Sequence, residues 1–190
     1  MKKILIFLGS TDVGGTEKQL LNILSIIQSS FEVSLVVFYR NGDLENKFRK
    51  LNLEYIDLYL IHWPAKGSQL KTWKALERIK EEGMTISIGV SNFAPHHLKE
   101  ILCKSKEKPV VNQIEISPFL QQKEISSFCV KNNIHLTGYC PLARAKKLGN
   151  KTIAQIAKDT NKTPAQVMIR WSIQNGYTVI PKSSNPKRIL

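Results

Sequence analysis

Short apolar runs rich in branched side chains alternate along the chain with longer segments whose apolar residues recur at helical spacing. A short apolar run bounded by turn residues predicts a buried strand, and an amphipathic segment predicts a helix that covers it. The predicted strands are residues 4–8, 33–38, 56–61, 86–90, 110–115, 135–139 and 178–181. The predicted helices are residues 16–28, 44–51, 69–82, 95–103, 122–133, 153–160 and 164–174.

This regular alternation of strand and helix predicts an α/β fold with a parallel sheet. Right-handed crossovers between parallel strands leave two architectures open, a doubly wound sheet or a (β/α) barrel. About seven strands are predicted, one fewer than a closed barrel needs. The clearest helix start is that of residues 164–174, where Thr163 is a predicted N-cap, Pro164 stands at the first helical position and Gln166 completes a capping box.

Composition describes an ordinary globular protein with an unusual charge. Of the 190 residues, 42% are hydrophobic and 23% are charged, and the net charge is +13. Residues 1–50 hold 7 basic and 5 acidic side chains (+2), which leaves 21 and 10 (+11) for residues 51–190. Such a charge favours anionic partners. The basic residues are scattered over helical segments without a basic run or a stacking platform, so no nucleic-acid partner is expected.

Cysteine usage and the N-terminal apolar run indicate where the protein works. Cys103, Cys129 and Cys140 are odd in number and form no CxxC pair, so we expect reduced thiols and neither a disulfide framework nor a zinc site. The apolar run at residues 4–8 is too short for a signal peptide or a membrane span. We therefore expect a cytoplasmic protein without a membrane partner.

Five motifs carry the candidate chemistry. In chain order they are LEYIDLYLIHWP (53–64), IGVSNF (88–93), NQIEISP (112–118), GYCPLAR (138–144) and IPKSSNPKRI (180–189). With this order and spacing, residues 51–190 resemble the aldo/keto reductase family. The resemblance implies strands four to eight of that family's TIM-type barrel, without its last helix. Each motif would then lie at the C-terminal end of a strand, where barrel enzymes keep their chemistry.

The resemblance implies a catalytic histidine and a nicotinamide site. His62 matches the imidazole that donates a hydrogen bond to the substrate carbonyl as negative charge develops on its oxygen. Ser91, Asn92 and Gln113 match the residues that hold the nicotinamide carboxamide, which needs both donors and acceptors. Tyr139 matches the aromatic residue on which the nicotinamide ring stacks.

A basic motif near residue 190 matches the family's residues that bind the 2′-phosphate of NADPH. It consists of Lys182, Ser183 and Arg188, two cations and a hydroxyl that suit a dianion, and it favours NADP(H) over NAD as the cofactor. Cys140 stands where the family commonly has serine. No metal site is expected, because the histidines outside the motifs have no acidic or cysteine partner at ligand spacing.

The first fifty residues do not show the tyrosine, aspartate and lysine that the family has on its second and third strands. Tyr39 is interpreted as a strand-end or turn aromatic. Residues 1–50 instead resemble the N-terminal βαβ unit of a glycosyltransferase with two Rossmann-like domains (GT-B), chiefly through Gly14-Gly15 before a predicted helix. We therefore predict an incomplete or patched barrel, with a Rossmann-like βαβα segment (1–50) packed on the same sheet as the reductase-like part (51–190).

The motifs predict an NADP(H)-dependent oxidoreductase that reduces an aldehyde or ketone by hydride transfer. Activity is expected to be weak or absent, because the family's tyrosine, which gives the proton to the substrate, is not found in residues 1–50. Loss of a general acid typically lowers the rate ~10²–10⁴-fold. The alternative is a non-catalytic chimeric (β/α) scaffold or a nucleotide-binding module. The expected partner is a small-molecule carbonyl compound. An incomplete barrel would also leave strand edges through which copies of the chain could pair as a homo-oligomer.

Overall fold

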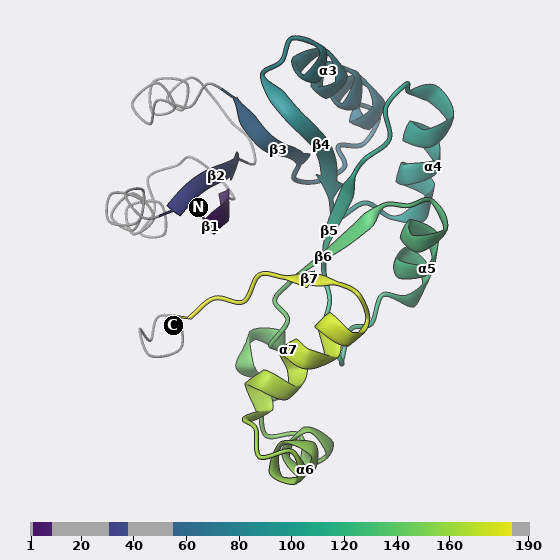
Figure 1. Ribbon diagram of the computed structural model, residues 1–190. Helices are drawn as coiled ribbons and strands as arrows, with labels where there is room; N and C mark the ends of the chain where they lie inside the picture. Colours follow the sequence, from purple (N-terminus) through teal and green to yellow (C-terminus); the bar gives the residue numbers. More distant parts are fainter. Residues whose placement is uncertain (1, 9–30, 38–54, 184–190) are drawn as a thin grey trace. The chain divides into compact units, whose positions relative to one another are not determined.

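A computed structural model describes residues 2–8, 31–37 and 55–183, and it confirms the predicted α/β class with parallel strands (Figure 1). Strands β1 (Lys2–Leu8) and β2 (Phe31–Val37) pair in parallel in a two-stranded sheet, with Lys2 opposite Phe31 and Leu8 opposite Val37. These strands were predicted from their apolar runs. The helices predicted at 16–28 and 44–51 lie outside the described residues.

A second sheet contains five strands in the order β3-β4-β5-β6-β7, which is also their order along the chain. The strands are β3 (Ile56–Ile61), β4 (Thr85–Ser91), β5 (Val111–Glu115), β6 (His135–Tyr139) and β7 (Thr178–Val179). Pairing is parallel between β3 and β4, between β5 and β6, and between β6 and β7. Successive parallel strands are what a βα repeat produces, so this part of the sequence prediction is confirmed.

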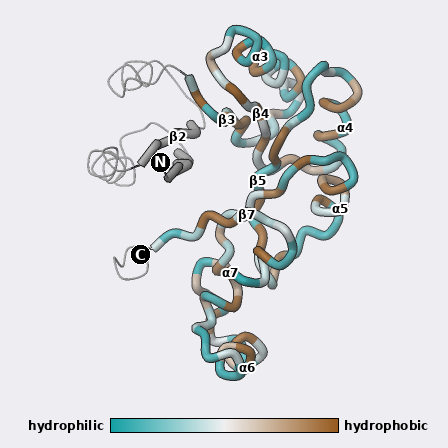
Figure 2. The backbone as a smooth tube through the Cα atoms, in the orientation of Figure 1, coloured by the Kyte–Doolittle hydropathy of each residue, from teal (hydrophilic) through white to brown (hydrophobic). Residues whose placement is uncertain are grey.

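Five α-helices connect these strands, and each begins and ends within two residues of its prediction. They are α3 (Gln69–Glu81), α4 (Pro95–Lys104), α5 (Lys123–Lys131), α6 (Lys151–Asp159) and α7 (Pro164–Gln174). A short 3₁₀ helix, η1 (Ala143–Ala145), was not predicted. In Figure 2, hydrophobic stretches lie along the strands, and hydrophobic and hydrophilic positions alternate along the helices. This is the pattern from which these elements were predicted. No helix in the described part of the chain is long and apolar enough to cross a bilayer.

The predicted capping box at the start of α7 is present. The Thr163 hydroxyl accepts from the Gln166 backbone N–H (3.3 Å), and the Gln166 side-chain oxygen accepts from the Thr163 N–H (2.9 Å). These bonds satisfy two of the backbone donors that a helix start leaves unpaired.

Replacing Thr163 with alanine should lower the free energy of unfolding by about 1 kcal/mol, because a backbone donor then loses its cap. Thr152→Ala is the matched control, since Thr152 lies exposed in the first turn of α6 and its side chain does not cap that helix, whose cap is Asn150. Urea denaturation of the three proteins measures the effect. Equal midpoints for Thr163→Ala and Thr152→Ala would show that the capping box adds no stability.

The chain divides into two compact units, residues 1–91 with 96–110 and residues 92–95 with 111–190. In the first unit, the buried Trp73 on α3 donates from Nε1 to the carbonyl oxygen of Glu107 (3.2 Å), and Lys80 pairs with the Glu107 carboxylate (2.8 Å). In the second unit, the core is built from the buried residues Phe93, Ile114, Ile116, Leu136, Ile153 and Met168.

Candidate functional site

Three of the predicted cofactor residues meet in the second unit, and we call Asn92, Gln113 and Tyr139 the strand-end cluster. Asn92 directly follows β4, Gln113 lies in β5 and Tyr139 ends β6. The Asn92 backbone N–H donates to the Gln113 carbonyl oxygen (2.8 Å), and the Tyr139 hydroxyl donates to Asn92 Oδ1 (2.8 Å). Residues up to 47 positions apart are therefore joined by short hydrogen bonds.

The local backbone explains why asparagine and glycine occur in these motifs. Asn92 has φ of 64°, a left-handed conformation that asparagine adopts more readily than most residues. A Cβ at Gly138, just before Tyr139, would lie 2.5 Å from Ile116 Cγ2, so only glycine fits this position in β6. Both residues thus allow the chain to bring the strand-end cluster together.

Electrostatics favour the protonated form of Tyr139. Burial raises the pKa of its phenol, the Coulombic interactions with Glu115 and Cys140 raise it further, and Arg144 opposes them. Arg144 itself lies 3.6 Å from the Glu115 carboxylate. The Tyr139 hydroxyl therefore keeps its proton at neutral pH, as its hydrogen bond to Asn92 requires. Sequence reasoning missed Glu115 and Arg144, although both lie within the quoted motifs.

Two further predicted residues lie at strand ends in the first unit. Ser91 is the last residue of β4 and is only 1% exposed. His62 follows β3 and is half-buried, and this burial lowers the pKa of its imidazole below the ordinary value of 6.5. The ring of Trp63 lies edge-on to it, with 6.1 Å between the ring centroids. His62 is therefore a neutral imidazole at physiological pH, able to donate one hydrogen bond.

The structure describes only part of the predicted 2′-phosphate site. Lys182 is exposed and Ser183 is half-buried, and both follow β7 in the second unit. Arg188 lies outside the described residues. Cys140 is half-buried with φ of 50°, immediately after Tyr139. In the described part of the chain, no group of three or more His, Cys, Asp or Glu side chains could hold a metal ion.

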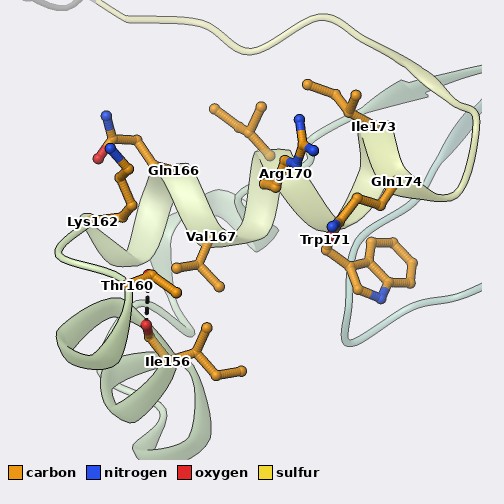
Figure 3. Close-up of a pocket in the computed structure, with 10 residues that line it drawn as sticks. Ile156, Thr160, Lys162, Gln166, Val167, Arg170, Trp171, Ile173 and Gln174 are labelled. Carbon is orange, nitrogen blue, oxygen red and sulfur yellow. Dashed lines mark hydrogen bonds between the residues drawn. The ribbon is translucent and has the colours of Figure 1, made fainter.

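A separate apolar groove of about 810 Å³ lies along α6 and α7 (Figure 3). Its lining includes Ile156, Val167, Trp171 and Ile173, and the hydroxyl of Thr160, another lining residue, donates to the Ile156 carbonyl oxygen at the end of α6 (2.7 Å). None of the predicted site residues lines this groove. It is therefore not a candidate for the carbonyl chemistry that the motifs indicate.

Comparison with known proteins agrees with the interpretation of the motifs. A sequence profile described as "Aldo/keto reductase family" matches residues 42–190, which begins before the boundary at 51 that the motifs suggested. A 9,11-endoperoxide prostaglandin H2 reductase of Trypanosoma cruzi is 48% identical over 162 residues, which are 84% of this chain and 55% of that protein. The chain thus spans about half the length of the curated relatives it matches.

Solved structures give the same picture. The aldo-keto reductase MGS-M4 from a Medee basin deep-sea metagenome library has a TM-score of 0.82 and 36% identity, and the match covers 99% of this chain and 73% of that one. A point mutant of Gox0644, solved in complex with NADPH, has a TM-score of 0.76 and 44% identity over 83% of this chain and 62% of its own. The glycosyltransferase resemblance of residues 1–50 finds no support in these comparisons.

Proposed function

The chain belongs to the aldo/keto reductase family, and on that premise we propose that it is an NADP(H)-dependent oxidoreductase that reduces a small aldehyde or ketone. The observation that carries the proposal is the strand-end cluster, because Asn92, Gln113 and Tyr139 lie together as a nicotinamide site requires. Hydrogen bonds, and not sequence proximity, join these residues. The related Gox0644 mutant crystallised with NADPH supports the choice of cofactor.

The residues of the strand-end cluster suit a nicotinamide. A carboxamide presents one acceptor and two donors, and the amides of Asn92 and Gln113 offer the complementary groups. Tyr139 offers a half-buried aromatic ring whose hydroxyl is already fixed on Asn92. That bond restricts the ring, so less side-chain freedom would be lost when a second ring stacks on it. When bound, NADPH would supply the hydride.

His62 is proposed to polarise the substrate carbonyl. Its pKa is lowered by burial, so its neutral ring carries one N–H that can donate to the carbonyl oxygen without losing a proton to solvent. Lys182, Ser183 and Arg188 are proposed to bind the 2′-phosphate, where two cations and a hydroxyl match a dianion. This set would favour NADPH over NADH.

The lowered pKa of His62 predicts a shifted pH profile. If the neutral imidazole is the active form, kcat/KM will fall when His62 becomes protonated. Because the pKa of His62 is below 6.5, this fall is expected below pH 6.5. Initial rates of aldehyde reduction measured between pH 5 and 8 should show an acidic limb with its midpoint below 6.5. A limb centred at or above 6.5 would contradict this role, since burial of the ring cannot produce it.

A second candidate function is a nucleotide-binding module without turnover. The arrangement of the strand-end cluster favours it, because all three residues belong to one compact unit, in which a hydrogen bond joins Tyr139 to Asn92. Residues 1–50 show no tyrosine, aspartate and lysine at the family's spacing, and Tyr39 lies outside the described residues. We therefore propose that any turnover is slow.

One experiment with two stages separates the candidates. Quenching of protein fluorescence by NADPH measures binding, and loss of NADPH absorbance with a panel of small aldehydes measures turnover. Saturable binding with aldehyde-dependent oxidation supports the reductase. Saturable binding without oxidation supports the nucleotide-binding module. Absence of binding at millimolar NADPH would contradict both.

A further inference from the structure

We propose that Asn112 is a positioning residue of the strand-end cluster, which fixes Asn92 by holding the backbone of Phe93. This inference rests on the proposed NADPH site and adds a residue that does not touch the cofactor. Asn112 lies in β5, immediately before Gln113, and its side chain is 0% exposed. It belongs to the same compact unit as Asn92 and Tyr139.

The side chain of Asn112 bonds both polar backbone groups of one residue. Its Oδ1 accepts from the Phe93 N–H (3.3 Å), and its Nδ2 donates to the Phe93 carbonyl oxygen (2.8 Å). A side-chain amide can thus supply the hydrogen bonds that a neighbouring strand would otherwise make, because it carries a donor and an acceptor at the spacing of a peptide group. Phe93 itself is buried, so its backbone groups have no water to bond instead.

These two bonds add to the one between the Asn92 N–H and the Gln113 carbonyl oxygen (2.8 Å). Three hydrogen bonds therefore attach residues 92–93 to residues 112–113. Asn92 needs this support, because its φ of 64° is a conformation that a free chain populates sparsely. Without the Asn112 amide, the turn would relax, and Asn92 Oδ1 would leave the Tyr139 hydroxyl.

Asparagine is the residue type that this position requires. Aspartate has the same shape but lacks the donor and would bring a buried negative charge towards the Phe93 carbonyl oxygen. Leucine or alanine would remove both of these hydrogen bonds to Phe93. The Asn112 Nδ2 also donates to the buried Cys129 Sγ on α5 (3.8 Å), so this nitrogen has a second partner besides the Phe93 carbonyl oxygen.

The first test needs no cofactor. The protein is labelled with ¹³Cζ-tyrosine, and the NMR signal of Tyr139 is identified as the one that disappears in Tyr139→Phe. The chemical shift of this signal is then compared between the unsubstituted protein, Asn112→Ala and Asn112→Asp. Both substitutions should shift it, because the Asn92–Tyr139 hydrogen bond is lost. The control Met168→Ala removes a buried side chain of α7 that makes none of these bonds, and it should leave the resonance in place. In the unsubstituted protein, the Phe93 amide proton should exchange slowly with solvent, a readout that does not require any variant to fold.

The second test asks whether the position of Asn92 matters for binding. Asn112→Ala should raise the NADPH Kd at least tenfold, whereas Met168→Ala, even with a lower Tm, should bind within twofold of the unsubstituted chain. An unchanged Tyr139 resonance, a rapidly exchanging Phe93 amide or an unchanged Kd in Asn112→Ala would each overturn the inference. If the unsubstituted chain does not bind NADPH, the proposed function falls, and the Tyr139 resonance alone decides whether Asn112 holds Asn92.

Discussion

Replacing His62 with alanine is expected to lower kcat/KM for aldehyde reduction by about 10²–10³-fold, with the NADPH Kd unchanged. The loss corresponds to removal of one donor that stabilises developing charge on an oxygen. Binding should not change, because His62 is proposed to contact the carbonyl substrate and not the cofactor. Single-turnover rates of NADPH oxidation at saturating aldehyde measure the effect directly, even if steady-state turnover is slow.

Two controls make the result on His62 specific. His62→Gln keeps a side-chain N–H donor and should recover part of the lost rate, because the proposed role is hydrogen-bond donation. His96→Ala removes an exposed histidine at the start of α4 that lies outside the motifs, and it should have no effect. A rate for His62→Ala within twofold of the unsubstituted chain would exclude His62 from the chemistry, whatever the cofactor does.

Asn92→Ala is expected to raise the NADPH Kd by about 10–100-fold. The change removes the amide that is proposed to bind the carboxamide and also the acceptor of the Tyr139 hydroxyl, so it should lose about two hydrogen bonds of roughly 1 kcal/mol or more each. Fluorescence titration with NADPH gives the Kd. Far-UV circular dichroism and the Tm show whether the fold is kept.

Asn133→Ala is the matched control for this substitution. Asn133 is exposed, follows α5 and has φ of 53°, so it shares the left-handed backbone of Asn92 but none of its contacts in the strand-end cluster. Alanine should therefore cause similar backbone strain at both positions and weaken NADPH binding only at residue 92. Equal Kd values for the two variants would show that backbone strain, and not the Asn92 amide, determines binding.

The described helices and strands were largely predictable because their patterns are local. Apolar runs located β3 and β6 at their observed ends, and the Thr163 and Gln166 pair located the start of α7. The 3₁₀ helix η1 was missed because Ala143, Arg144 and Ala145 all adopt positive φ, although the segment contains no glycine to indicate it. Only the surrounding tertiary structure can impose this conformation on such residues.

The candidate site was predictable in its residue types but not in its bonds. The motifs suggested Asn92, Gln113 and Tyr139 one by one, and the structure adds the hydrogen bonds that join them. The pair of bonds from Asn112 to Phe93 spans 19 residues, and the effect of Glu115 on Tyr139 acts through space. Neither follows from periodicity or spacing. At the other end of the chain, a double glycine and one βαβ pattern were too little information to identify a family for residues 1–50.

The central claim is that this chain has an NADP(H) site built on the strand-end cluster. The most direct measurement is isothermal titration calorimetry of the unsubstituted chain with NADPH, repeated with NADH and with the Asn92→Ala variant. We expect one saturable NADPH site per chain, binding at least tenfold weaker for NADH because it lacks the 2′-phosphate, and a similar loss in the variant. NADPH affinity that is absent, or that is the same in the Asn92→Ala variant, would contradict the claim.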